Sequence, residues 1–418
     1  MPTLGQRMKR NDIEWLNVVI FIVTPALSLY GFYTTQLTFQ TAIWAVVYYF
    51  CTGLAITAGT QTVESIIISL PSTNPFEQLH RYFAHRSYEA AFPMRLLLAL
   101  FGAGALQGSI KWWCRDHRAH HRYTDSSRDP YGANKGVFWS HIGWLVVKQD
   151  KDKIGRVDIS DLKRDKIVMW QHDWFPIIGL FMAFVFPTLV AYIGWGDFWG
   201  GFYFAGVARL VVVHHATFCV NSLAHWLGEA SYDDRQTPRD HFITALVTLG
   251  EGYHNFHHEF PSDYRNAILF WQYDPTKWTI WICSLFGLTY NLKMFPENEI
   301  VKGRIQMQEK KIDELKKKLN WGKPLDELPE WTWKEFALKK DGGQNYLVVD
   351  KIVYNVHSFM EDHPGGRGFL KTSIGRDVSA SFNGAIYFHS NAARNLATRM
   401  RIAKIVGEIP DDEKAKEE

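Results

Sequence analysis

The sequence predicts a mainly α-helical membrane protein with four transmembrane helices, a histidine metal site on their cytosolic side, and a separate C-terminal soluble domain. Three observations lead to this prediction. Long apolar runs fill the first half of the 418-residue chain, histidines recur at helical spacings between those runs, and the second half is polar. A chain of this length is expected to hold at least two units. The net charge of +3 gives no indication of a nucleic-acid partner.

Five apolar stretches compete to cross the bilayer, each judged against the roughly 20 apolar residues that a transmembrane helix needs. They are residues 15–33, 37–59, 92–110, 174–194 and 198–224. The short turns inside the first pair and the last pair contain no Lys or Arg. Basic residues flank the other ends: Arg7, Lys9 and Arg10, then Lys148, Lys151 and Lys153. The positive-inside rule therefore places both termini in the cytosol and the short turns in the lumen.

The histidine clusters indicate that residues 92–110 do not cross. Clusters on the two sides of this stretch can meet at one centre only if an even number of crossings separates them. A single crossing there would put the first two clusters on opposite faces, so we expect a re-entrant or interfacial segment. Four spans remain, at 15–33, 37–59, 174–194 and 198–224, within a membrane domain of residues 1–300.

Repeated histidine spacings predict a site for two metal ions. Two H-x-x-H-H motifs begin at His117 and His254, and positions i, i+3 and i+4 share one helix face. The candidate ligands are His80, His85, His117, His120, His121, Asn221, His225, His254, His257 and His258. Imidazole suits iron, zinc, copper or nickel, so ligand type alone leaves the metal open. The histidines that lack this spacing are expected to be structural: His141, His172, His214, His215, His241 and His357.

The second half of the chain predicts a linker and a domain. Residues 301–330 are charged and include KKIDELKKKL, which is typical of an exposed helix. Residues 331–410 mix short predicted strands and helices with turn signals such as Asp341-Gly-Gly. We therefore expect an independent α+β domain after a solvated spacer.

The motifs together resemble the stearoyl-CoA desaturase family, specifically the fungal type with a C-terminal cytochrome b5 domain. The resemblance rests on GLAITAG, HRYFAHRSYEA, RDHRAHHRYTD, DPYGANKGVFWSHIGWLV, VNSLAHW and GEGYHNFHHEFP. It implies a four-helix stem under a cytosolic helical cap that holds two iron ions. The nine histidines above would be the iron ligands, and Asn221 would reach a metal through water.

The same resemblance implies an activity and a location. The expected enzyme is an acyl-CoA Δ9 desaturase of the endoplasmic reticulum membrane that uses O2 to insert a cis double bond into palmitoyl- or stearoyl-CoA. A mid-chain methylene has no acidic proton, so its oxidation depends on the power of a cofactor. No catalytic residue beyond the metal ligands is therefore expected. Electrons would come from NADH–cytochrome b5 reductase through the cytochrome b5 domain.

Substrate contacts also carry over from the resemblance. Trp113 would help to wall the acyl tunnel, and Arg115 and Asp116 would hold the coenzyme A end. Lys148 matches one of two adjacent basic residues near the nucleotide, while Gln149 replaces the second.

Two further histidines match the axial ligands of haem b. They are His363, which begins His-Pro-Gly-Gly, and His389. Two protein ligands leave no open position for O2, so this haem is expected to carry electrons.

Residues 60–78, TQTVESIIISLPSTNPFEQ, depart from the family pattern. They separate the second span from the first histidine pair, and Pro71 and Pro75 cannot continue a helix. The segment is interpreted either as a loop or as translated intron sequence. Two alternative functions therefore stay beside the desaturase: a membrane di-iron lipid hydroxylase, and an inactive membrane-tethered electron carrier if the insertion disrupts the metal site.

Overall fold

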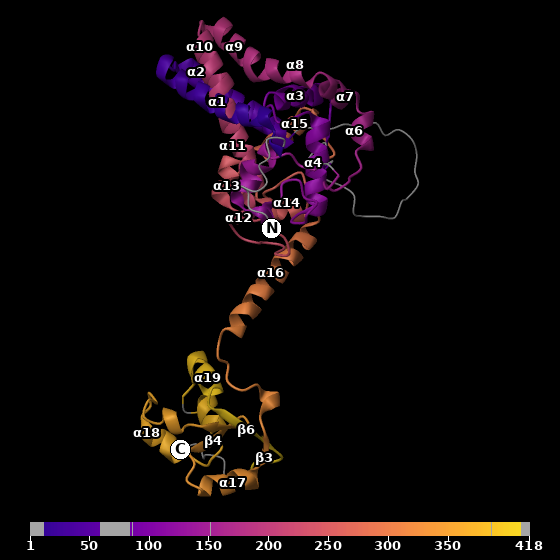
Figure 1. The fold of residues 1–418 in the computed structure, drawn as a ribbon. Coiled ribbons are helices and arrows are strands. Elements are labelled where there is room, and N and C mark those ends of the chain that lie inside the picture. The colour runs from indigo at the N-terminus through magenta and orange to yellow at the C-terminus, as the bar shows by residue number, and fades with distance from the viewer. Residues whose placement is uncertain (1–11, 59–83, 86, 151, 386, 411–418) are drawn as a thin grey trace. The chain divides into compact units, whose positions relative to one another are not determined.

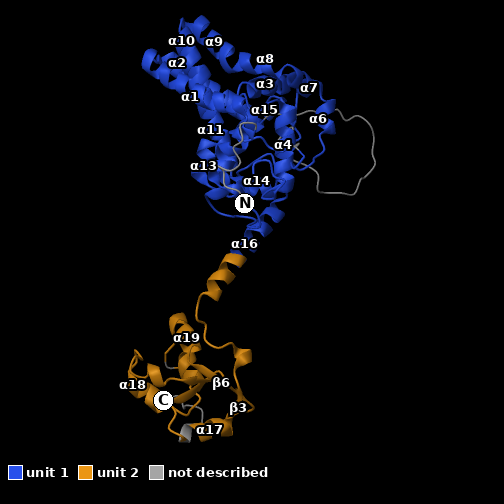
Figure 2. Ribbon diagram, in the orientation of Figure 1, with its two compact units in different colours: residues 1–309 blue, residues 310–418 orange. Residues whose placement is uncertain are grey.

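The computed structural model describes residues 12–58, 84, 85, 87–150, 152–385 and 387–410. The chain divides into two compact units, residues 1–309 and 310–418 (Figure 2). The division lies within helix α16, Glu297–Lys317, which begins before the predicted linker start at residue 301.

The described chain contains four helical stretches that are long and apolar enough to cross a membrane (Figure 1). The first two are single helices, α1 (Trp15–Thr34) and α2 (Phe39–Ala58). The third runs through α8 (Phe175–Leu180), η5 (Phe181–Val185) and α9 (Phe186–Trp195). The fourth runs through α10 (Phe198–Gly200), η6 (Gly201–Ala208), α11 (Arg209–Asn221) and α12 (Leu223–Trp226). The prediction of four spans is confirmed, with small shifts at the ends.

Two π-helical segments interrupt the later spans. The first, η5, ends two residues before Pro187, which has no backbone N–H to donate to the preceding turn. The second, η6, packs against α1, α2 and α9. A wider turn of this kind is a common response to a missing hydrogen bond or to close neighbours.

The fifth apolar stretch forms only the helix α3, Phe92–Ala103. Its 12 residues reach about 18 Å, well short of the roughly 30 Å hydrocarbon core. The expectation that this stretch does not span is therefore confirmed, and α3 instead packs against α2.

Short helices and a two-stranded sheet make up the rest of the first unit. The sheet pairs β1 (Glu89–Ala90) with β2 (Thr289–Tyr290) in antiparallel fashion. The helices are α4 (Ile110–Tyr123), η3 (Ala133–Lys135), η4 (Trp139–Gly143), α5 (Trp144–Val146), α6 (Ser160–Arg164), α7 (Lys166–Asp173), α13 (Phe242–Val247), α14 (His254–Glu259) and α15 (Pro275–Leu285). Helix α4 begins where the Ser109 hydroxyl accepts a hydrogen bond from the Trp112 N–H, a typical N-cap.

The second unit is an α+β domain built on a four-stranded sheet of order β3-β6-β5-β4. The strands are β3 (Glu330–Thr332), β4 (Tyr346–Val349), β5 (Ile352–Asn355) and β6 (Arg401–Val406), with β3 parallel to β6 and the other pairs antiparallel. The helices are η7 (Leu325–Glu327), α17 (Trp333–Asp341), η8 (His357–Phe359), α18 (Arg367–Ser373), η9 (Ser381–Ala385) and α19 (Asn391–Thr398). Apolar side chains of β4 alternate between two buried clusters, as a strand buried on both faces requires.

Candidate metal centre and haem pocket

Eight of the predicted ligands form two groups of four histidines. One group is His85, His117, His121 and His257, and the other is His120, His225, His254 and His258. In each group one ring nitrogen from every residue lies within 4.8 Å of the others. The ninth predicted histidine, His80, lies outside the described residues.

Each H-x-x-H-H motif contributes to both groups. On α4 the i and i+4 pair, His117 and His121, belongs to the first group, and His120 belongs to the second. On α14 the arrangement is reversed: the i and i+4 pair belongs to the second group, and His257 belongs to the first. The i+3 side chain diverges from the other two around the helix, and this divergence separates the groups. Two short helices therefore hold both sites together.

The spacing of the ring nitrogens fits metal ligation. The Nε2 atoms of His254 and His258 lie 3.1 Å apart, and those of His121 and His257 lie 3.2 Å apart. Metal–imidazole bonds of about 2.1 Å at right angles would set neighbouring ligand nitrogens about 3 Å apart. Each group thus presents converging nitrogens at a spacing that suits one ion.

Burial keeps the imidazoles neutral. Burial first, and the charges of neighbouring imidazoles second, hold the pKa values of His85, His117, His121 and His258 well below the ordinary value. The same causes lower the pKa of His254 to about 3. A neutral imidazole offers a lone pair to a metal ion, so the residues present fit two ions at neutral pH.

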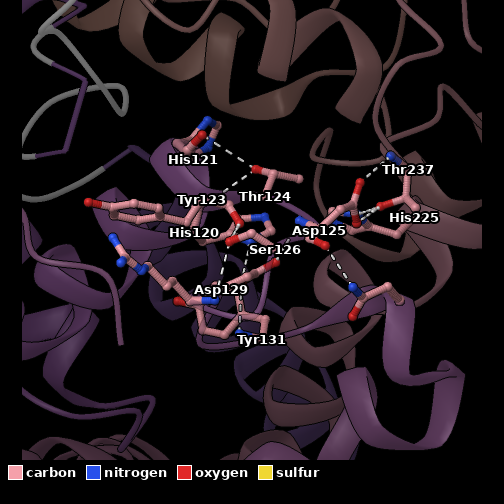
Figure 3. A network of polar contacts seen from close by, with 12 residues as sticks. His120, His121, Tyr123, Thr124, Asp125, Ser126, Asp129, Tyr131, His225 and Thr237 are labelled. Atoms are coloured by element: carbon pink, nitrogen blue, oxygen red, sulfur yellow. Dashed lines mark hydrogen bonds and ion pairs between the residues drawn. The ribbon is translucent and has the colours of Figure 1, made fainter. Parts of the chain in front are cut away.

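A buried carboxylate orients His120 (Figure 3). The His120 Nδ1–H donates to Asp129 Oδ1 at 2.9 Å, and the Tyr131 N–H donates to the same oxygen. Burial alone would raise the pKa of Asp129, but its interaction with His120 and these hydrogen bonds lower it on balance. The His120 Nε2 is buried, and no donor or acceptor in the described part of the chain bonds to it. This fixed tautomer is the arrangement of a metal-ligating histidine with a supporting carboxylate.

Two more ligands are oriented in the same way. His225 Nδ1–H donates at 2.8 Å to the Thr237 hydroxyl, which in turn donates to Asp125 at 2.6 Å (Figure 3). His257 Nδ1–H donates to Asn266 Oδ1 at 3.1 Å. Asp125 is a non-glycine residue in the left-handed region, with φ 63°, which aspartate tolerates better than most residues.

Sequence reasoning missed these four supporting residues: Asp125, Asp129, Thr237 and Asn266. The acidic residues of YTDSSRDP, directly after the second histidine motif, were a usable signal, since histidine ligands usually have a carboxylate partner. Thr237 and Asn266 carry no comparable signal.

We expect Asp129→Asn to weaken metal binding by about 10–100-fold, because a neutral amide supports the His120 tautomer less firmly than a carboxylate. Titration of the metal-depleted protein with Fe²⁺ measures the change. Asp150→Asn is the matched control, since Asp150 is exposed and pairs with Lys153 on the surface. Unchanged Fe²⁺ affinity in Asp129→Asn would contradict the orienting role.

The predicted ligand Asn221 is the last residue of α11 and is buried. A break at Ser222 separates it from His225 on α12, so the two do not share one regular helical turn. Asn221 lines the cavity described next, as does His117 of the first group.

A cavity of about 760 Å³ adjoins the first histidine group. His117 lines it, and so do apolar side chains of all four spans, among them Phe21, Ile56, Leu180 and Val213. The predicted substrate residues Trp113, Arg115 and Asp116 also line it.

Two details of the cavity wall concern the predicted substrate residues. Trp113 stacks on His117 with ring centres 5.0 Å apart, and Arg115 donates to Asp116 at 2.7 Å. Lys148 is exposed and is absent from the described lining, whereas its neighbour Gln149 is part of it.

The histidines expected to be structural lie outside the two metal groups. His172 bonds to Ser109, His214 to the Ala105 carbonyl, and His241 to Thr244. His141 and His215 bond to each other at 3.0 Å, and His357 bonds to Asn345.

In the second unit His363 and His389 face each other. Their ring centres lie 6.5 Å apart, and two imidazoles that bind one iron from opposite sides would have centres about 6 Å apart. Each Nδ1–H donates to a backbone carbonyl, of Gly366 and Phe382 respectively, so Nε2 is left as the ligand atom. The residues present therefore fit a haem with two axial histidines.

Comparisons with known proteins find relatives of both parts of the chain. Residues 76–291 match the family described as fatty acid desaturase, and residues 332–406 match the cytochrome b5-like heme/steroid binding domain. The chain is 47% identical over 395 residues to a probable acyl-CoA desaturase of Schizosaccharomyces pombe, covering 94% of this chain and 78% of the relative. It is 43% identical to acyl-CoA desaturase 1 of Saccharomyces cerevisiae, covering 94% and 74%. It is 36% identical over 287 residues to the human stearoyl-CoA desaturase, covering 68% and 75%.

Proposed function

The chain belongs to the fatty acid desaturase family and is an acyl-CoA desaturase with a C-terminal cytochrome b5 domain, and from this premise we propose its substrate, electron route and location. The substrate is palmitoyl- or stearoyl-CoA, and the product carries a cis double bond at Δ9. The observation that carries this proposal is the cavity that reaches Asn221 and His117, a member of the first of the two four-histidine groups.

The cavity suits a long apolar chain with a polar end. Its lining is largely apolar along the spans, and Arg115, Asp116 and Gln149 supply polar groups. Orienting a substrate in this way lowers the entropy cost of reaction at one chosen position. Trp113, stacked on His117, would hold the chain against the ligand helix.

We assign two iron ions to the histidine groups and haem b to His363 and His389. Bound iron would supply the oxidising power, drawn from O2, that removes hydrogens from an unactivated methylene. The haem, with both axial positions taken by histidines, would pass electrons from NADH–cytochrome b5 reductase.

The protein is a multi-pass membrane protein by its four apolar helices. We place it in the endoplasmic reticulum membrane with both termini in the cytosol, on the positive flanks described above. The metal-ligand histidines on α4 and α14 would then face the same compartment as the reductase.

Expression in a host that lacks its own Δ9 desaturase tests the proposal. Growth without added unsaturated fatty acid is expected, with Δ9 palmitoleic and oleic products identified by mass spectrometry. Hydroxylated lipids instead would favour the di-iron hydroxylase. Bound haem with neither iron nor product would favour the electron carrier.

Residues 60–78 lie outside the described residues, and a deletion tests what they do. Closing a loop costs only about 0.6 kcal/mol per doubling of its length, so folding should tolerate the segment. Ligand positions, however, need a precision of about 0.5 Å, and the segment precedes His80 and His85. We expect its deletion to raise activity and iron content severalfold without moving the double bond. Lower activity after deletion would show an adapted loop and exclude the intron interpretation.

A further inference from the structure

The segment Gly104–Gly108 connects α3 to the ligand helix α4 and forms part of the cavity wall. Leu106, Gln107 and Gly108 line the cavity. The backbone here is strained, with positive φ at Leu106 (50°) and Gly108 (94°). A Cβ on Gly108 would lie 2.4 Å from the Trp112 ring, so the close approach also requires glycine. A non-glycine residue in this conformation persists only where its surroundings hold it.

Side chains of α11 hold this wall segment by its backbone carbonyls. Arg209 is buried and donates through Nη1 to the Gly104 carbonyl at 2.9 Å. His214, also buried, donates through Nε2 to the Ala105 carbonyl at 2.8 Å. One hydrogen bond runs in the opposite direction: Gln107 Nε2, in the wall segment, donates to the Thr217 hydroxyl of α11 at 3.0 Å.

Arg209 shows how firmly this connection is made. Its Nη2 donates to the Ala183 carbonyl at 2.8 Å, in the π-helical segment η5, and its guanidinium lies 4.8 Å from the Tyr48 ring centre. A charged side chain within a span is costly unless it is paired in this way, and such residues are usually functional. Three apolar elements and the wall segment therefore meet at one side chain.

The connection relates the cavity wall to both metal groups. Helix α11 is followed by α12, which carries His225 of the second group, and α4, which follows the wall segment, carries His117 of the first. A shift of about 1 Å between a bound acyl chain and the reacting centre is enough to change which carbon atoms are placed for reaction. Hydrogen bonds from α11 to the wall thus set where along the acyl chain the metal groups act.

We propose that His214 and Arg209 are positioning residues that determine the position of the double bond. This inference rests on the proposed desaturase function. His214 contributes by its hydrogen bond to Ala105 and by its place in the cavity lining, and Arg209 by fixing the start of the wall segment.

The test compares product double-bond positions in a host without its own Δ9 desaturase. Loss of one buried hydrogen bond weakens the preference for one double-bond position over its neighbours by roughly tenfold. His214→Leu removes the donor at similar volume, so we expect roughly a tenth or more of its product at positions next to that of the parent chain. His214→Gln restores a donor for the Ala105 carbonyl and should restore a single position. His215→Leu changes the exposed neighbour and should leave the product pattern unchanged.

The outcomes separate this inference from the proposed function. A single product position in His214→Leu, with only a lower yield, would overturn the positioning role, because a purely structural residue changes amount and not position. If His214→Leu accumulates too little protein, Arg209→Lys decides, since a lysine cannot serve the Gly104 and Ala183 carbonyls together; an unshifted product there overturns the proposal. Absence of any unsaturated product from the parent chain would instead contradict the desaturase assignment itself.

Discussion

Replacing His120 with Ala is expected to lower desaturation at least about 100-fold and to reduce bound iron, while the haem signal stays at its full level. The substitution removes one of four nitrogens from its group and one hydrogen bond from the buried Asp129 carboxylate. Loss of a supporting residue alone commonly costs 10–100-fold at a metal site, so loss of a ligand should cost at least as much. The ratio of iron to haem in the purified full-length protein measures the effect independently of expression.

His257→Ala tests the other group in the same assay. Since His257 belongs to the first group and His120 to the second, both variants should be inactive only if both ions are needed. His215→Ala is the matched control, an exposed histidine outside both groups. Full activity in either ligand variant would contradict the two-ion assignment.

Replacing His363 or His389 with Ala is expected to abolish the six-coordinate spectrum of the reduced haem and to stop NADH-driven turnover. An open axial position changes both the potential and the ligation of the iron, so electron transfer through this domain should fail. Iron content should be unaffected, because no described contact of these two histidines involves the metal groups.

Adding a separate cytochrome b5 should restore part of the turnover in both haem variants. His357→Ala is the control, since His357 is exposed and its imidazole bonds to Asn345. A bis-histidine spectrum that persists in His363→Ala or His389→Ala would refute the ligand assignment.

Much of the fold could be predicted from the sequence because the bilayer imposes simple lengths. Four spans follow from apolar runs near 20 residues, and the short helix α3 follows from the requirement that the histidine clusters share one side. The π-helical turns could not be predicted, since they depend on Pro187 and on close packing of η6 against neighbouring helices.

The metal site was predictable as a set of residues but not as a geometry. Spacing shows that His117, His120 and His121 share a helix face, yet their division between two groups appears only when α4 and α14 are seen together. Asp125 supports His225 through Thr237, which lies 112 residues later in the chain than Asp125, and no local pattern reports such a contact. Of the predicted substrate residues, Lys148 is the one that the described cavity lining does not include.

The exchange of ligands between α4 and α14 has a consequence for how the enzyme is loaded in the cell. Because each helix supplies both groups, an ion bound in one group would fix the helices that the other group needs, and loss of that ion would loosen both. Binding energy is then shared with folding, as at other sites that do not preform without metal. Iron limitation should therefore produce a mixture of complete and empty molecules with few half-filled ones. The rate of desaturation in the cell would then fall because fewer enzyme molecules are active, and not because each molecule works more slowly.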